Sequence, residues 1–304
     1  MQENAGGESH QEQDKSEKKQ RRGFLFFLIP AALITAMAVF GGLALHDYLE
    51  YQAAKNEYSS LDEYISEAAA TASSAETGTT EEAAEAMTEA DSSTLEGEEV
   101  TPITYPDLKI DYDSLMKTNA AFAGVLYVPA VKIRYPFVQG KDDSEYLHKT
   151  FRGTYNFAGC VFMESQASKD LTDSNTIIYG HNMKDGTMFG RLKQFVYQSG
   201  LCATDPYIYV YTKEKVLKYE IFSYYISDVY SDAYIAFDNA DKDAYDAYVA
   251  AALKRSQYPE YNKEDIDFSK YPHLLTLSTC SGTNHIDRFL VHAALIGEAA
   301  EATD

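Results

Sequence analysis

The chain has 304 residues and a formal net charge of −21 at pH 7, enough length for one or two domains with sizeable hydrophobic cores. The acidity is concentrated, because residues 47–100 carry fifteen acidic residues against one lysine, which leaves only −7 for residues 101–304. No basic stripe runs along the sequence, so the composition argues against nucleic-acid binding.

A run of uncharged residues, 23–45, follows an N-terminal tail, 1–22, that ends in several lysines and arginines. At about 1.5 Å per residue the run can cross the roughly 30 Å hydrocarbon core of a membrane. The positive-inside bias predicts a cytoplasmic tail and places the rest of the chain outside. A cleaved signal peptide is the alternative, with a candidate site at Ala36-Met37-Ala38, but cleavage there would leave an apolar mature terminus. We therefore predict a retained anchor.

Residues 46–104 are predicted to form an acidic stalk outside the membrane. A helical pattern continues from Asp47 to about Ile65, and the composition from Ser66 to Glu99 becomes rich in alanine, serine, threonine and glutamate. Such a sequence buries too little apolar surface to offset its ordering entropy, so we predict a disordered, self-repelling spacer. A role as an acidic docking tail is the alternative.

The folded part is predicted over residues 105–297, followed by a polar tail, 298–304. Short apolar and β-branched runs, bounded by turn residues, recur along it. The predicted strands are 122–128, 131–138, 159–163, 175–179, 207–212, 216–226, 274–280 and one that begins at Arg288. The predicted helices are 112–119, 188–197 and 241–255, with one helical turn at 144–148. Many short strands and few helices predict a mainly β fold, a closed or nearly closed barrel with appended helices.

Cys280 is the strongest candidate for chemistry, because it ends the predicted strand 274–280 where a strand meets a loop. Arg288 follows eight residues later and begins the next strand. Free cysteine is also a common core residue, and Arg288 could instead form a salt bridge with Asp287. A cysteine with the ordinary pKa of about 8.5 is mostly thiol at pH 7, so a nucleophile here needs a base.

Three histidines are candidates for that base. His181 directly follows the apolar strand 175–179 in a glycine-flanked loop, where the structure can orient its ring, and we favour it. His285 in the loop of the cysteine and His292 on the following strand are the alternatives. Two further histidines beside turns are predicted to be solvated, His148 and His273.

An arginine, with a pKa above about 12, cannot act as a base, but its planar fork can stabilise an oxyanion or bind substrate carbonyls. A cysteine, a histidine and an arginine together therefore suit acyl transfer through a thioester.

The motif Thr276-Leu277-Ser278-Thr279-Cys280, with Arg288 eight residues on, resembles the sortase signature. The segment 179–189 (YGHNMKDGTMF) resembles the histidine segment of class B sortases, and 138–151 is similar to the early loop of that class. A helix-bearing insertion at 227–272 and a single N-terminal anchor also match class B rather than class C pilin polymerases. The resemblance covers about residues 110–297.

This resemblance implies an eight-stranded sortase β-barrel and an extracytoplasmic cysteine transpeptidase in the plasma membrane of a Gram-positive bacterium. Cys280 would attack the Thr-Gly-type bond of a C-terminal sorting signal, His181 would be the acid/base, and Arg288 would bind the oxyanion or substrate carbonyls. The implied partners are surface proteins or pilins with sorting signals, and an amine acceptor on a lipid II-type peptidoglycan precursor or a pilin lysine. By analogy, the substrate groove would be lined by Tyr179, Ser278, Leu147, Tyr234 and Ile235.

Two other functions stay open at this point. One is a membrane-anchored cysteine peptidase that hydrolyses the same type of signal, and the other is a non-enzymatic wall-associated module with a buried Cys280. No cofactor or metal is predicted, because the histidines and cysteines lack convergent ligand spacing. Cys160 and Cys202 could form a disulfide, but we favour two free, buried thiols.

Overall fold

The structure, a computed structural model, describes residues 6–67, 104–235, 237, 240–259, 261–262, 266–280 and 286–300. Most of the predicted stalk, the end of the C-terminal tail and His285 lie outside these residues. The chain divides into two compact units, Met1–Asn56 and Glu57–Asp304.

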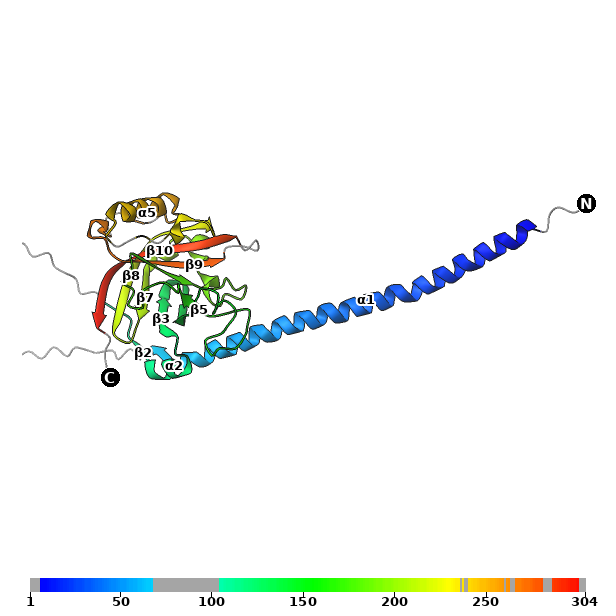
Figure 1. Cartoon of the computed structure of the whole chain (residues 1–304), viewed down its shortest axis with the longest axis horizontal. Coiled ribbons are helices and arrows are strands. Elements are labelled where there is room, and N and C mark those ends of the chain that lie inside the picture. The colour runs from blue at the N-terminus through cyan, green and yellow to red at the C-terminus, as the bar shows by residue number, and fades with distance from the viewer. Residues whose placement is uncertain are drawn as a thin grey trace, which may run out of the picture. The chain divides into compact units, whose positions relative to one another are not determined.

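Helix α1 (Gly6–Leu61) contains the predicted anchor 23–45 (Figure 1). Large apolar side chains along it are exposed, including Leu33, Phe40 and Leu43. A stretch at Pro30–Tyr64 is long and apolar enough to cross a membrane by length and composition. Exposed apolar surface is unfavourable in water, and a lipid environment removes that penalty. This helix is therefore a candidate membrane anchor.

The second unit is built on a closed eight-stranded barrel with the strand order β10-β8-β7-β3-β4-β5-β6-β9. Two neighbouring pairs, β4–β5 and β6–β9, are parallel, and the others are antiparallel. The barrel strands are β3 (Phe122–Val128), β4 (Ile133–Gln139), β5 (Val161–Met163), β6 (Asn175–Tyr179), β7 (Tyr207–Tyr211), β8 (Lys215–Asp228), β9 (Leu274–Cys280) and β10 (Asp287–Ala300). The predicted mainly β, eight-stranded barrel with appended helices is confirmed.

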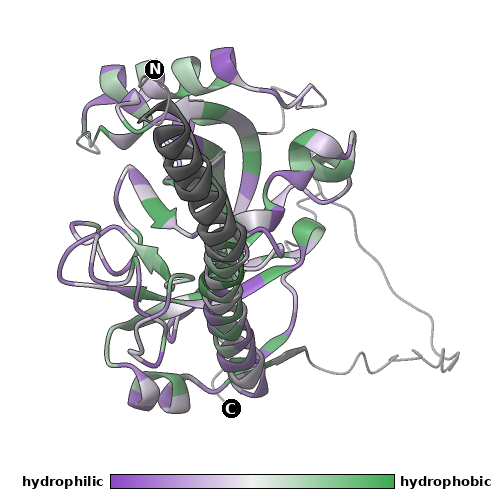
Figure 2. Cartoon of the chain, turned by 90° about the vertical axis from the view of Figure 1, so that its right-hand side faces the viewer, coloured by the Kyte–Doolittle hydropathy of each residue, from purple (hydrophilic) through white to green (hydrophobic). Residues whose placement is uncertain are grey.

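Helix α5 (Lys242–Arg255) packs against β8 (Figure 1). The side chain of Asp241 caps the helix by accepting from Ala244 N. Hydrophilic and hydrophobic residues alternate along this helix, at the top of Figure 2. Its buried residues Tyr245 and Val249 join a cluster with strand residues such as Leu274 and Leu290. The helix thus covers one face of the strands that carry the predicted site.

The beginning of the second unit includes the last residues of α1. Tyr58, Leu61 and Ile65 are buried, and β1 (Ile65–Glu67) pairs with β2 (Leu108–Ile110) after the short helix η1 (Asp62–Tyr64). The sequence assigned these residues to the stalk, whereas here residues 57–67 pack with the barrel. Their apolar side chains are spaced so that one face of the helix end is buried.

The remaining helices are short. They are α2 (Tyr112–Thr118), η2 (Pro129–Val131), η3 (Phe189–Arg191), α3 (Gln194–Tyr197), α4 (Leu201–Thr204), η4 (Asp232–Tyr234) and η5 (Phe268–Lys270). The prediction of one continuous helix over 188–197 is wrong. Met188 has a positive φ of 50°, and Gly190 lies so close to Met183 that an added Cβ would be 2.3 Å from its carbonyl oxygen. The chain therefore turns tightly here and forms η3 and α3 separately.

Candidate active site

Three neighbouring strands bring the predicted catalytic residues to one edge of the barrel. Strands β6 and β9 are parallel with Tyr179 level with Ser278, and Gly180 N donates to Ser278 O at 3.1 Å. His181 therefore emerges beside the end of β9. In the antiparallel pair β9–β10, Arg288 is the direct partner of Cys280. Direct partners have Cα atoms about 4.5–5.5 Å apart.

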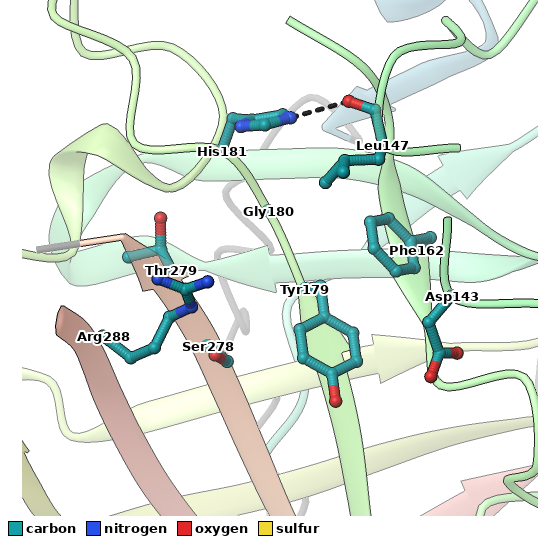
Figure 3. Close-up of a pocket in the computed structure, with 9 residues that line it drawn as sticks. All are labelled: Asp143, Leu147, Phe162, Tyr179, Gly180, His181, Ser278, Thr279 and Arg288. Atoms are coloured by element: carbon teal, nitrogen blue, oxygen red, sulfur yellow. Dashed lines mark hydrogen bonds between the residues drawn. The ribbon is translucent and has the colours of Figure 1, made fainter. Parts of the chain in front are cut away.

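A pocket of about 230 Å³ lies at this edge (Figure 3). Its lining includes His181, Arg288 and three of the predicted groove residues, Tyr179, Ser278 and Leu147. Four lining residues were not predicted: Asp143, Phe162, Gly180 and Thr279. The backbone of Cys280 directly follows Thr279, so the cysteine adjoins the pocket.

The imidazole of His181 is held by the loop that precedes β5. Nε2 of His181 donates to the backbone carbonyl of Leu147 at 2.6 Å, since a carbonyl can only accept (Figure 3). The neutral ring then has its lone pair on Nδ1. Gly180 is required next to it, because an added Cβ would lie 2.6 Å from the ring of Phe189.

One wall of the pocket is aromatic. The ring of Tyr179 stacks on Phe162 with centroids 5.2 Å apart and on Tyr234 at 6.4 Å. The hydroxyl of Tyr234 shares a hydrogen bond of 2.7 Å with Ser278 Oγ. Burial raises the pKa of Tyr179, and the nearby carboxylates of Glu164 and Asp143 raise it further, so its hydroxyl is neutral. The wall presents flat apolar surface edged by neutral hydroxyl groups.

Two predicted groove residues differ in their surroundings. Tyr234 is tied to Ser278 and Tyr179, which places it beside the pocket. Ile235 is 64% exposed and does not line it.

His292, one of the alternative bases, is a core residue. It is fully buried, and its Nδ1 lies 3.0 Å from Thr276 Oγ1 and 3.2 Å from Tyr248 Oη. Burial lowers the pKa of His292 to about 3. It does not line the pocket. Arg288 lines the pocket, and its guanidinium donates to the backbone carbonyl of Asp287 at 3.1 Å.

His148 is exposed, as predicted from the sequence, and its ring also stacks on that of His181 with centroids 5.7 Å apart. No sequence pattern links these two histidines. Cys160 and Cys202 are both buried and free, as we favoured from the sequence. Within the described part of the chain, no group of three metal-ligating side chains is arranged to hold an ion.

Comparisons with known proteins identify the family to which this barrel and its site belong. A family model described as a sortase domain matches residues 126–296. The chain is 29% identical to sortase B of Listeria monocytogenes over 175 residues, which cover 57% of this chain and 68% of that protein. It is 26% identical to sortase B of Staphylococcus aureus over 178 residues, covering 56% and 67%. The solved structure of Clostridium perfringens sortase B matches with 30% identity and a TM-score of 0.55, covering 61% of this chain and 99% of that one.

The closed eight-stranded barrel is like that of the sortase B structures. The chain belongs to the sortase family, and its relatives place it in class B. The resemblance drawn from the motifs is confirmed. Sortases are cysteine transpeptidases, so the protein is an enzyme of this type and the reading as a non-enzymatic module is wrong.

Proposed function

We propose that this protein is a membrane-anchored sortase that cleaves a C-terminal sorting signal through a thioester on Cys280. The supporting observation is the convergence of three strand ends. His181 follows β6, Cys280 ends β9, and Arg288 pairs with Cys280 on β10, all beside one pocket. This arrangement supplies a nucleophile, an acid/base and a fixed cation on separate, rigid elements.

In the first half of the reaction, the sulfur of Cys280, having lost its proton, attacks the carbonyl carbon of the scissile peptide bond. The negative charge that develops on the carbonyl oxygen is stabilised by the guanidinium of Arg288. The protonated imidazole of His181 gives a proton to the leaving nitrogen, the C–N bond breaks, and the C-terminal remnant departs. The acyl group stays on the enzyme as a thioester.

In the second half, an amine attacks the thioester carbon. The neutral imidazole of His181 takes a proton from the attacking nitrogen, the C–S bond breaks, and the Cys280 thiolate is restored. The Leu147 carbonyl favours the tautomer that carries its proton on Nε2, so Nδ1 is the nitrogen that accepts and returns the proton.

The substrates are surface proteins or pilins with a C-terminal sorting signal, and the acceptor is an amine of a lipid II-type wall precursor or a pilin lysine. The anchor at residues 23–45 would hold the catalytic unit outside the plasma membrane with the N-terminus inside, supported by the basic residues before it. Tyr179, Ser278, Leu147, Tyr234 and Ile235 would contact the signal.

The test uses the full chain in detergent with labelled sorting-signal peptides, with and without an amine acceptor. We expect a transfer product that requires the acceptor, and no product with Cys280→Ala. His181→Ala and Arg288→Lys should each lower kcat/KM by about 10²–10³-fold, since each removes a group that acts in the transition state. Mass spectrometry should detect the acyl-enzyme on Cys280.

The outcomes separate the alternatives. Release of free acid at the same rate with and without acceptor would indicate a peptidase that uses water. Full activity of His181→Ala would contradict the assignment of the acid/base. Ile235→Ala is a useful comparison, because its side chain does not line the pocket and its effect should be confined to KM.

A further inference from the structure

The loop 146–160 makes two contacts with the imidazole of His181. The Leu147 carbonyl accepts from Nε2 of His181, and the ring of the next residue, His148, stacks on its face with an interplanar angle of 20°. A hydrogen bond fixes the ring's rotation about its axis, and a stacked ring restricts its tilt. Together the two contacts define one orientation of the His181 ring.

The loop that carries Leu147 and His148, residues 146–160, is held together by its own hydrogen bonds. Lys149 and Tyr155 form an antiparallel bridge, and Asn156 N donates to His148 O at 3.0 Å. The centroids of the Tyr155 and His148 rings are 6.2 Å apart. Cys160 N closes the loop by donating to Tyr146 O at 3.0 Å. The loop therefore has a fixed shape, although it contains no regular helix or strand.

Gly159 holds the Leu147 carbonyl in place. It has a positive φ of 58°, and an added Cβ would lie 2.3 Å from Leu147 O. Only glycine allows this backbone approach, because both the conformation and the space exclude a side chain. The position of the carbonyl that binds His181 thus depends on the position of Gly159.

Gly159 is in turn fixed by Tyr58, near the end of α1. The hydroxyl of Tyr58 donates to Gly159 O at 2.6 Å, and both groups are buried. The Tyr58 ring also packs edge-on against Tyr135, at 5.5 Å. The hydroxyl of Tyr135 accepts from Met188 N at 3.1 Å in the loop that follows His181. Tyr58 thus contacts both Gly159, which lies against Leu147 O, and Tyr135, which binds the loop after His181.

A second set of contacts fastens the same loop to α1. Arg152 N donates to Glu57 Oε1 at 2.8 Å, and the guanidinium of Arg152 donates to Ser60 Oγ at 3.1 Å. Residues 57–60 therefore hydrogen-bond to the loop at two separate points, Arg152 and Gly159.

We propose that the loop 146–160 positions His181 for proton transfer through Leu147 O and the His148 ring, and that Tyr58 braces this loop. His148 and Tyr58 are positioning residues, because they act through His181 and hold no reacting atom. The proposal rests on the proposed role of His181 as acid/base. It makes the end of the helix that follows the membrane anchor a part of the catalytic apparatus.

The test compares His148→Ala, His148→Phe and Tyr58→Phe in the full chain in detergent. His148→Ala removes the stacked ring, so kcat should fall about tenfold with KM unchanged, since small misplacement of a catalytic group lowers the rate and leaves binding intact. His148→Phe keeps a flat ring and should restore most of kcat. Tyr58→Phe loses one buried hydrogen bond and should lower kcat about fivefold.

A second readout reports the ring directly. In protein labelled with ¹⁵N-histidine, two-bond ¹H–¹⁵N spectra distinguish the Nε2–H tautomer from the Nδ1–H tautomer. We expect His181 to be the Nε2–H form in the wild type and a mixture in His148→Ala and Tyr58→Phe. Wild-type kcat together with an unchanged His181 tautomer in both variants would overturn the proposal.

Controls keep the two hypotheses separate. His46→Ala and Tyr197→Phe change exposed side chains of residues outside the loop 146–160 and should alter neither readout. If His181→Ala retains activity, the proposed function fails. If His181→Ala is inactive but His148→Ala and Tyr58→Phe behave as wild type, only the positioning proposal fails. Thermal melting shows whether each variant is folded, and Tyr58→Phe remains informative if His148→Ala is not.

Discussion

At the scale of single residues, two histidines of the barrel occupy opposite environments. His181 lines an open pocket, whereas His292 is enclosed between β8, β9 and α5. The His292 ring stacks on Tyr225 at 5.1 Å, its Nδ1 is near Tyr248 and Thr276, and its Nε2 is buried without a partner in the described part of the chain. Protonation of both ring nitrogens would create a buried positive charge without a counter-charge in contact with the ring, so this ring stays neutral.

His292 should make stability depend on pH. Burial lowers its folded-state pKa to about 3 from 6.5, so between these values the unfolded chain binds a proton that the folded chain does not. Its contribution is complete above pH 6.5 and is lost as the pH falls toward 3, by about 1.4 kcal/mol per unit. In His292→Phe this contribution is absent. Denaturant unfolding should therefore show that the variant loses less free energy of unfolding between pH 6.5 and pH 5 than the wild type does.

The prediction concerns how steeply the free energy of unfolding changes with pH, and not its absolute value. His292→Phe removes the ring nitrogen that hydrogen-bonds to Tyr248 and Thr276, which should cost about 1 kcal/mol at every pH. His46→Phe changes an exposed histidine and should keep the wild-type slope. Equal slopes in the wild type and His292→Phe would show that the buried ring does not titrate as described.

At the scale of elements, an ion pair links two elements of the insertion 227–272, α5 and η4. Arg255 at the end of α5 makes two hydrogen bonds, of 2.5 and 2.9 Å, to the carboxylate of Asp232 in η4. Through these bonds Arg255 holds the pKa of Asp232 below its usual range. The element η4 also carries Tyr234, which contacts Ser278 and Tyr179 in the pocket. The pair therefore fixes one side of the groove to the helix.

Breaking this pair should weaken substrate binding. In Asp232→Ala and Arg255→Ala the η4 element loses its attachment, so Tyr234 must be ordered when the peptide binds. An exposed pair contributes about 1 kcal/mol at most, so we expect KM to rise up to about fivefold with kcat unchanged. Steady-state kinetics with a sorting-signal peptide measures this effect.

A matched pair provides the control. Asp267, which caps η5, and Lys270 at its end form an exposed ion pair at 3.4 Å, and neither residue lines the pocket. Asp267→Ala should leave KM unchanged. Similar KM values for Asp232→Ala and Asp267→Ala would contradict the role of η4.

The sequence predicted the elements whose side-chain pattern is local. The β-branched and apolar runs predicted the strands, and Cys280 and Arg288 were chosen as candidates because they flank one hairpin. His181 was chosen because it follows a strand in a glycine-flanked loop. The helix predicted at 188–197 was wrong because its break depends on Gly190 lying against Met183, a contact between loops. The stacking of His148 on His181 and the place of Asp143 in the pocket also arise only from tertiary contacts, which no spacing reveals.

At the scale of the whole molecule, the catalytic unit begins before the boundary that composition suggests. The change to an alanine- and glutamate-rich sequence after residue 65 predicts a spacer, yet the residues just before it are buried. Tyr58, Leu61 and Ile65 pack into the barrel unit, and β1 pairs with β2 over three residues. The segment 57–67 is therefore part of the barrel unit, although residues 68–103 separate the two along the chain.

This leads to a prediction about truncation. A fragment that begins at residue 104 lacks three buried side chains, each contributing about 1.5–3 kcal/mol, and the partner strand of β2. Its Tm should be about 10 °C or more below that of a fragment that begins at residue 46, because 1 kcal/mol shifts the Tm of a domain of this size by about 2–4 °C. It should also have a lower kcat, since Tyr58 no longer braces the loop that holds His181. Adding a synthetic peptide of residues 46–67 should recover part of both losses, whereas equal Tm and kcat for the two fragments would show that the end of α1 is dispensable.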